Sequence, residues 1–411
     1  MLNFLYVWLL LLQVNFPVEI GLLKPVFFSS HAIAVTALSP APMITPQQAL
    51  ERIFTAPNIQ ANWFAASFLQ QVSATQIEGV IQQVTQDLGA YQSVAETADG
   101  FEVRFERGTV LAQIRLDGNG QIVSFFLQPA SAPISLEEAA ATLENTPYPA
   151  SLLVLKNGVA QVEVNAGEPL AVGSAFKLAV LAALQNQIQA GALTWDTVVE
   201  LQPEWKSLPS GMLQDWPATS ALTMETLAIL MISISDNTAT DALINLVGRE
   251  NIEALTPRNR PFLTTREFFA LKNPVNASWL ERYRRGDLAQ KRQVLSTVPE
   301  LPLPSASLFA GAPLSLDVEW FFTSRELCQL MGQVAPLSAM QVNPGVANPA
   351  DWQDIAFKGG SEPGVLNLTT WLKDDAGNTY CVTTTWNNAD QALDETALSQ
   401  FYQGIISGLK R

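Results

Sequence analysis

Histidine is almost absent from this chain of 411 residues, and its absence excludes more chemistry than any other feature. The single histidine, His31, falls in a stretch that we expect to be a leader. Without imidazole in the body of the chain, a Ser-His-Asp triad, a Cys-His dyad and a histidine-ligated metal site are excluded. Any acid–base chemistry must therefore use lysine, aspartate, glutamate or tyrosine.

Cysteine and positive charge are also scarce. The two cysteines, Cys328 and Cys381, cannot build a thiolate cluster, so we expect no metal and no cofactor. They could pair if the chain is exported, and two buried free thiols are the equal alternative. Lysine and arginine total 23 against 38 aspartates and glutamates, a net charge of −15 with no basic block. This balance argues against nucleic acid or an anionic membrane surface as a partner.

The N-terminal segment, residues 1–37, is expected to be a signal peptide or an uncleaved N-terminal membrane anchor. Its apolar run, residues 4–12, is too short to span a bilayer comfortably and matches the core of a signal peptide, with a cleavage site near residues 32–34. Either reading places the body of the chain outside the cytoplasm, in the periplasm or the extracellular space. The remaining alternative is a buried N-terminal helix, which Pro17 and Pro25 would interrupt.

Residues 44–128 are predicted to form a small α+β domain. Thr45 caps the first helix, Pro46 occupies its first turn, and Gln48 closes a capping box. The pattern then predicts two further helices and an antiparallel meander, at residues 61–71 and 74–87 for the helices and 91–97, 101–107, 109–116 and 121–127 for the strands. This order resembles the cone-shaped ketosteroid-isomerase-like and cystatin-like domains. We expect a docking or ligand-holding module, since no catalytic constellation occurs here.

Residues 129–134 form a linker rich in proline and alanine, and residues 135–411 form a second domain. Asn157-Gly158 between two apolar runs predicts a hairpin. The segment from about residue 193 to residue 257 is expected to be mostly helical. Strands are expected again at 355–358, 366–373 and 380–385, followed by a helix near 395–409. The two sets of strands most simply form one sheet around an all-helical middle.

Three short motifs in this domain can carry chemistry. Ser174-Ala175-Phe176-Lys177 places a hydroxyl and an amine one helical turn apart, at a helix start that favours a developing oxyanion. Ser235-Asp236-Asn237 offers a hydroxyl and an amide in a loop, with the aspartate free to tie that loop down. Lys358-Gly359-Gly360-Ser361 places a lysine on a strand whose glycines allow a substrate to approach closely. A second Ser-x-x-Lys, Ser407 to Lys410, is interpreted as chance.

Each motif also has an ordinary structural explanation. Ser174 could simply cap an apolar helix, Ser235-Asp236-Asn237 could be only a helix-ending loop, and the lysine with two glycines could be an edge strand with a bulge.

Together, and in this order, the three motifs resemble the motif set of class A β-lactamases and penicillin-binding proteins. The resemblance covers roughly residues 135–411 and implies a fold of the α+β class. That fold is an α/β sandwich with a β-lactamase-like antiparallel sheet and an all-helical subdomain, here preceded by the small cone-like α+β domain. The implied partner is a small-molecule β-lactam or a peptidoglycan-like substrate.

The resemblance also implies a role for each matching residue. Ser174 would be the acylated nucleophile, and Lys177 its general base or proton relay. Ser235 would pass a proton to the leaving nitrogen. Asn237 would hold the side-chain amide of the substrate together with Lys177. Lys358 would supply positive potential for the substrate carboxylate and help to lower the pKa of Lys177.

The glycine-rich strand would complete the site. The backbone N–H groups of Ser174 and Ser361 would form the oxyanion hole, and Gly360 would let the substrate lie close to the strand. Gly359 is a departure, because a Thr or Ser hydroxyl usually stands there and helps to bind the carboxylate. Its loss should weaken that recognition by roughly 1.5–3 kcal/mol.

The deacylating glutamate is the second departure. No clean Glu-x-x-Leu-Asn loop occurs, and the nearest candidate is Glu267, which also forms a predicted capping box with Thr264. We therefore expect a serine hydrolase of the class A β-lactamase kind, acting through an acyl-Ser174 intermediate. A penicillin-binding-protein-like D,D-peptidase or weak esterase is the alternative enzyme. A non-catalytic peptidoglycan- or acyl-binding module is the alternative outside enzymes.

Overall fold

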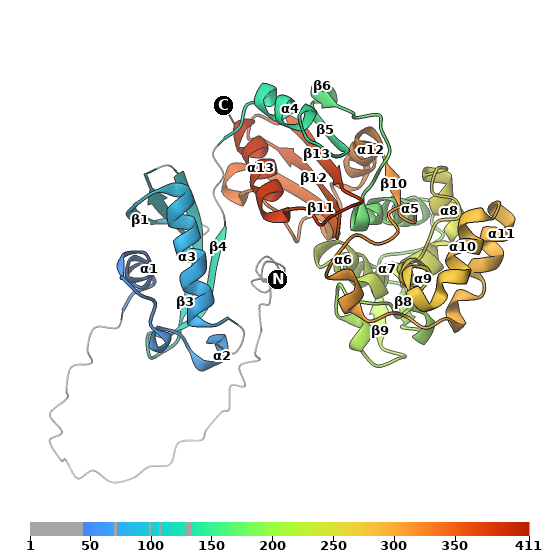
Figure 1. Ribbon diagram of the computed structural model, residues 1–411, viewed down its shortest axis with the longest axis horizontal. Helices are drawn as coiled ribbons and strands as arrows, with labels where there is room; N and C mark the ends of the chain where they lie inside the picture. The colour runs from blue at the N-terminus through green and yellow to red at the C-terminus, as the bar shows by residue number, and fades with distance from the viewer. Residues whose placement is uncertain (1–43, 70–71, 98–99, 107, 129–132, 411) are drawn as a thin grey trace, which may run out of the picture. The chain divides into compact units, whose positions relative to one another are not determined.

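The computed structural model describes residues 44–69, 72–97, 100–106, 108–128 and 133–410 (Figure 1). The predicted signal peptide or anchor lies outside these residues. The chain divides into two compact units, with the division between Ala130 and Ser131. Within the part that the structure describes, no helix is both long and apolar enough to cross a membrane, and no cluster of side chains is suited to a metal ion.

The N-terminal unit is a four-stranded antiparallel sheet with helices packed on it. Its helices are α1 (Pro46–Thr55), α2 (Ala66–Leu69) and α3 (Ala74–Leu88), and its strands, in sheet order, are β1 (Tyr91–Thr97), β2 (Gly100–Phe105), β3 (Gly108–Leu116) and β4 (Ile122–Gln128). The capping box of Thr45 and Gln48 is present, as predicted. The single helix expected at residues 61–71 is wrong over its described part, because residues 61–69 form a 3₁₀ turn, a bridge from Phe64 to Ile122 and then the short α2.

The C-terminal unit is built on a five-stranded antiparallel sheet. In sheet order its strands are β11 (Asp354–Glu362), β12 (Val365–Lys373), β13 (Thr379–Asn387), β5 (Ala150–Lys156) and β6 (Val159–Val164). The prediction that strands from both ends of the domain share one sheet is therefore confirmed. The hairpin at Asn157-Gly158 is confirmed as well, because both residues adopt the positive φ, 50° and 78°, that this turn requires.

Helices cover both faces of this sheet (Figure 1). On one face lie α4 (Leu136–Glu144) and α13 (Glu395–Gly408). Leu143 of α4 and Ile405 of α13 share a buried apolar cluster with Trp386 of β13. On the other face lie α5 (Lys177–Gln189) and α12 (Ser324–Val334), and the helical region continues beyond them. The predicted class, an α+β fold with an antiparallel sheet and a helical subdomain, is confirmed.

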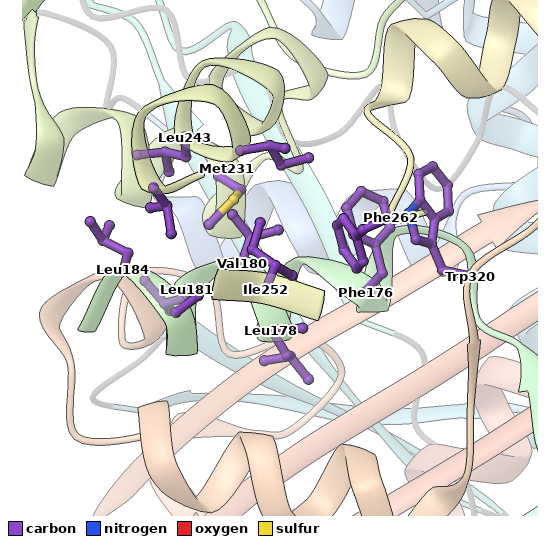
Figure 2. Close-up of a cluster of buried hydrophobic side chains, with 14 of the residues drawn as sticks. Phe176, Leu178, Val180, Leu181, Leu184, Met231, Leu243, Ile252, Phe262 and Trp320 are labelled. Atoms are coloured by element: carbon purple, nitrogen blue, oxygen red, sulfur yellow. The ribbon is translucent and has the colours of Figure 1, made fainter. Parts of the chain in front are cut away.

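The helical region is assembled around α5. Its other helices are α6 (Met224–Ser233), α7 (Asn237–Val247), α8 (Arg249–Leu255), α9 (Thr265–Lys272), α10 (Ala277–Arg285) and α11 (Leu288–Leu295). Every residue of α5 from Lys177 to Leu184 is buried, and Figure 2 shows its apolar side chains meeting those of α6, α7 and α8. Fixing α5 on all sides also fixes the turn that precedes it.

The stretch 193–223 corrects the expectation of a mostly helical segment. It contains the two-stranded sheet β8 (Val198–Glu200) and β9 (Ala221–Thr223), with two 3₁₀ turns between them. Pro203, Pro209 and Pro217 explain the difference, because proline lacks the N–H that a helix interior needs.

Cys328 on α12 and Cys381 on β13 form a disulfide, which resolves the two alternatives left by the sequence. The bond joins α12, on the face of the sheet that also carries α5, to the middle strand of the sheet.

Candidate active site

Ser174 lies in a short 3₁₀ turn, Gly173–Phe176, immediately before α5. The expectation of a helix starting at Ser174 is thus met by a tighter first turn, with the α-helix itself beginning at Lys177. Before the turn, the side-chain amide of Asn387 bonds to both backbone groups of Ala171. It donates to Ala171 O at 2.9 Å and accepts from Ala171 N at 2.8 Å.

The turn is also clamped by the neighbouring strand β10 (Phe321–Phe322) and the residue before it. Val172 N donates to Trp320 O at 3.1 Å, and the ring of Phe176 stacks on Trp320 at 3.8 Å between centroids. The serine is therefore carried on a rigid segment, as a nucleophile requires.

Lys177 is completely buried, and its amine meets the second motif. Its Nζ lies 2.6 Å from Ser235 O, 3.0 Å from Ser235 Oγ and 2.7 Å from Asn237 Oδ1. Burial lowers the pKa of Lys177 well below its ordinary value, and the nearby positive charge of Lys358 lowers it further. A lowered pKa increases the uncharged fraction of this amine at a given pH, and the uncharged form is the one that accepts a proton.

Lys358 reaches the same hydroxyl from β11. Its Nζ donates to Ser235 Oγ at 3.1 Å, so that this hydroxyl lies between two lysine amines. Burial lowers the pKa of Lys358 to about 7. The structure thus brings the lysines of the first and third motifs together at the serine of the second.

Ser235 is positioned by unusual backbone geometry and by the aspartate that follows it. Ser235 has a φ of 57°, a conformation that non-glycine residues rarely adopt. Asp236 caps α7 by accepting from Ala239 N at 2.8 Å, and also accepts from Met212 N and Leu213 N at 2.7 and 2.9 Å. The prediction that this aspartate ties the loop down is confirmed.

The third motif passes directly beside the Ser174 turn. A side chain at Gly360 would place its Cβ 2.2 Å from Val172 O and 2.4 Å from Ser174 N, so only glycine fits there. On the other side of this contact, a Cβ at Gly173 would lie 3.1 Å from Ser361 N. The backbone N–H groups of Ser174 and Ser361 therefore belong to adjoining segments. The pairing of β11 with β12 is continuous through the two glycines, so they form no bulge.

Gly359, where a hydroxyl is missing, has little free space. A Cβ there would lie 2.9 Å from the ring of Phe357 and 3.3 Å from Asn367 O. A serine or threonine at this position would require the Phe357 ring to move.

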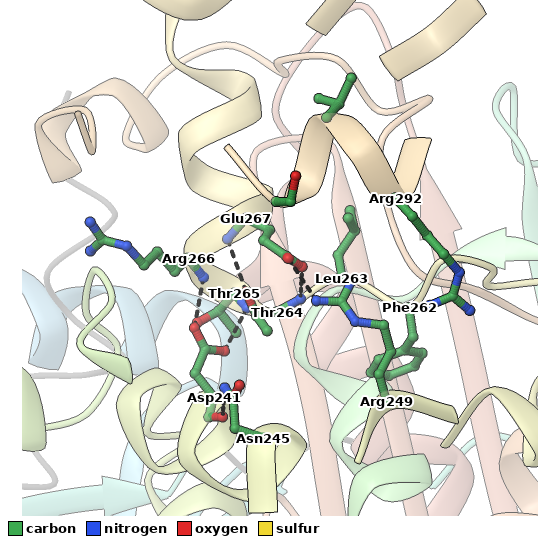
Figure 3. A network of polar contacts seen from close by, with 12 residues as sticks. Asp241, Asn245, Arg249, Phe262, Leu263, Thr264, Thr265, Arg266, Glu267 and Arg292 are labelled. Atoms are coloured by element: carbon green, nitrogen blue, oxygen red, sulfur yellow. Dashed lines mark hydrogen bonds and ion pairs between the residues drawn. The ribbon is translucent and has the colours of Figure 1, made fainter. Parts of the chain in front are cut away.

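Glu267 has a different environment from the other candidates (Figure 3). It forms the predicted capping box, accepting from Thr264 N at 2.8 Å while its own N–H donates to Thr264 Oγ1 at 3.1 Å. Its other carboxylate oxygen pairs with Arg249 at 2.6 Å. These partners account for both oxygens, whereas Lys177 and Lys358 make their contacts at Ser235. The role of Glu267 as a base stays a prediction.

Asp241 was missed by sequence reasoning. It lies one turn beyond Asn237 on α7, is buried, and accepts from Thr265 N at 2.6 Å and Arg266 N at 2.8 Å (Figure 3). Burial raises the pKa of Asp241 to about 7, although the two backbone hydrogen bonds oppose this. It joins the helix of the second motif to the start of α9. The only sequence signal was its helical spacing from Asn237.

Comparison with known proteins identifies one family. The sequence model of the Beta-lactamase enzyme family matches residues 137–268, which include Ser174, Lys177, Ser235 and Asn237. The resemblance to β-lactamases and penicillin-binding proteins is confirmed over this part of the chain. No curated protein matches the sequence.

Several solved structures are similar to the chain. A β-lactamase from Sphaerobacter thermophilus is 21% identical, with a TM-score of 0.46, and the match covers 67% of this chain and 94% of that one. PBP-A is 17% identical, with a TM-score of 0.46 and coverage of 69% and 98%. A class A β-lactamase from Bacteroides cellulosilyticus is 16% identical, with a TM-score of 0.45 and coverage of 66% and 96%.

Proposed function

We propose that this chain is a serine hydrolase that opens β-lactams, or a related amide or ester, through an acyl-Ser174 intermediate. The observation that carries the proposal is the position of Ser235 Oγ, 3.0 Å from Lys177 Nζ and 3.1 Å from Lys358 Nζ. Two lysines that converge on one hydroxyl, one of them a single turn after Ser174 in the chain, would provide proton transfer without imidazole, as this sequence requires.

Acylation would proceed by attack of Ser174 Oγ on the substrate carbonyl carbon, while uncharged Lys177 takes the hydroxyl proton. The negative charge developing on the carbonyl oxygen would be stabilised by the N–H groups of Ser174 and Ser361. When the C–N bond breaks, Ser235 would donate its proton to the leaving nitrogen and recover one from Lys177. Deacylation would need water to attack the ester, releasing the acid and restoring Ser174.

A chromogenic cephalosporin tests the proposal when colour and intact protein mass are followed together. Sustained colour supports hydrolysis of the β-lactamase kind. A lasting adduct on Ser174 without turnover supports a penicillin-binding-protein-like peptidase. If neither colour nor an adduct appears, acylation by β-lactams is contradicted. The remaining candidates are then a weak esterase and a non-catalytic peptidoglycan- or acyl-binding module.

The peptidase alternative is favoured by the surroundings of Glu267 and by Gly359. Both oxygens of Glu267 are engaged by Thr264 and Arg249, and the carboxylate-binding hydroxyl is absent at Gly359. An acyl-enzyme without an effective water-activating base would be long-lived.

Substitution of Glu267 by Gln decides whether this residue is the base. We expect the deacylation rate to change little, because the carboxylate caps α9 and pairs with Arg249. The measurement is decay of the pre-formed acyl-enzyme, followed by mass. A general base would instead contribute about 10²–10⁴-fold, and a loss of that size would assign the role to Glu267. Glu326 is a matched control, since it closes an equivalent capping box with Thr323 and pairs with Arg258.

The charge of Lys358 should make recognition of a substrate carboxylate depend on pH. Because burial lowers its pKa to about 7, Lys358 loses its charge as the pH rises through that value. We therefore expect KM for a carboxylate-bearing β-lactam to rise above about pH 7. A Lys358→Arg variant, which stays charged, should not show this rise. An identical rise for an esterified substrate without the carboxylate would contradict the assignment.

We also propose that the chain is exported, to the periplasm or the extracellular space, with residues 1–37 as signal peptide or anchor. The support is the Cys328–Cys381 disulfide, since such bonds persist mainly in oxidising compartments. N-terminal sequencing of the mature protein from fractionated cells would distinguish cleavage from anchoring, and recovery in the cytoplasmic fraction would contradict export.

A further inference from the structure

A second buried lysine lies at the end of α9, outside the three motifs. Lys272 Nζ is 2.6 Å from Glu319 Oε1 and 2.8 Å from Glu362 Oε1. The side chains of Lys272 and Glu319 are completely buried, and that of Glu362 is 12% exposed. The Lys272 ammonium also lies 4.0 Å from the centre of the Phe268 ring. None of the roles described above uses this cluster.

One carboxylate of the cluster belongs to the strand of the third motif. Glu362 is the last residue of β11 and directly follows Ser361. Alternate residues of a strand share a face, so Glu362 lies on the face of Gly360 and Lys358. That face contacts the Ser174 turn at Gly360 and the second motif at Lys358.

The other carboxylate belongs to the segment that clamps the Ser174 turn. Glu319 directly precedes Trp320, whose carbonyl accepts from Val172 N and whose ring stacks on Phe176. Lys272 therefore bonds both to Glu362, the neighbour of Ser361, and to Glu319, in the segment that holds the Ser174 turn. These are the two segments whose N–H groups would bind the oxyanion.

The cluster holds one ammonium between two carboxyl groups. Burial alone would lower the pKa of Lys272, but Glu319 and Glu362 outweigh it, so the net shift is upward and the lysine stays charged. Burial, together with the charge of Glu362, raises the pKa of Glu319 well above its ordinary value. Lys272 is thus the group on which the arrangement depends.

We propose that Lys272 is a positioning residue for acyl transfer, which sets the spacing between the Ser361 N–H and the Ser174 N–H through its bonds to Glu362 and Glu319. The inference rests on the proposed function. A positioning role predicts that loss of Lys272 slows acylation without weakening substrate binding. The two N–H groups act on the transition state, whereas Lys358, which would bind the substrate carboxylate, is left in place. A role in general stability would not predict this selective loss.

The test is Lys272→Met, with Lys373→Met as the matched control. Lys373 forms an ion pair with Asp354 at the far end of β11, at 3.5 Å, with a side chain 34% exposed. We expect Lys272→Met to lower the acylation rate constant about 10²-fold, the effect of a displacement of roughly 1 Å in a reacting site. The dissociation constant of the noncovalent β-lactam complex, obtained from the concentration dependence of the acylation rate, should stay close to that of the parent. Lys373→Met should acylate like the parent.

Glu362→Gln provides the second variant if Lys272→Met does not fold. It keeps the shape of the side chain and leaves the buried Lys272–Glu319 pair in place, but weakens the tie to β11. We expect the same selective loss in the acylation rate constant, of smaller size. Acylation at the parental rate in either folded variant, or an equal loss in the Lys373→Met control, would overturn the inference. No adduct on the parent would instead overturn the proposed function, and the inference with it.

Discussion

Substituting Ser174 by alanine should abolish the acyl adduct and reduce hydrolysis by about 10³-fold or more, because removal of a nucleophile eliminates the covalent pathway. The turn itself should be unaffected. Asn387 and Trp320 hold it through backbone atoms of Ala171 and Val172, which the substitution leaves in place. Intact mass after incubation with a β-lactam, together with steady-state colour from a cephalosporin, measures both effects.

The chain contains its own matched control for this experiment. Ser407 also stands three residues before a lysine, but it lies near the end of α13, and Lys410 pairs with Asp351 at 3.6 Å with a side chain 37% exposed. A Ser407→Ala variant should therefore acylate like the parent. An adduct that survives in Ser174→Ala, or disappears in Ser407→Ala, would contradict the assignment of the nucleophile.

The elements that local sequence chemistry determines were predictable. The hairpin at Asn157-Gly158 and the capping boxes at Thr45 and Thr264 follow from interactions between residues close together in the chain, and all three are present. The strand β11 was predicted only to Lys358, although it continues to Glu362. Two glycines ended the strand pattern in the sequence, whereas in the fold they are what lets the strand pass the Ser174 turn.

In the candidate site, too, residues in local motifs were predictable and residues that depend on tertiary contacts were not. Ser174, Lys177, Ser235 and Lys358 were recognisable because each belongs to a short motif. Asp241 and the Lys272 cluster were not, because their partners come from other helices and strands and only the folded chain brings them together. Their polar atoms resemble ordinary helix and strand residues in the sequence. Burial is what gives them a role, and burial depends on the whole tertiary structure.

Lys177→Met should lower acylation by about 10²–10⁴-fold, the usual contribution of a general base. Lys177→Arg should be similarly impaired, since a guanidinium cannot give up its proton at any accessible pH. The parent should gain acylation activity as the pH rises through the lowered pKa of Lys177, and neither variant should show that rise. Rate constants for adduct formation, determined over the pH range in which the parent stays folded, measure this. Lys410→Met, the lysine of the second Ser-x-x-Lys, is the control.

Stability supplies an independent readout of the same amine. The pKa of Lys177 is lower in the folded protein than its ordinary value, chiefly through burial, so the folded chain binds fewer protons at this site than the unfolded chain. The contribution of Lys177 to the free energy of unfolding therefore increases with pH between the folded pKa and the unfolded one. Lys177→Met should remove this increase, as measured by urea unfolding at several pH values. An unchanged pH dependence of both acylation and unfolding in Lys177→Met would show that Lys177 remains charged and is not the base.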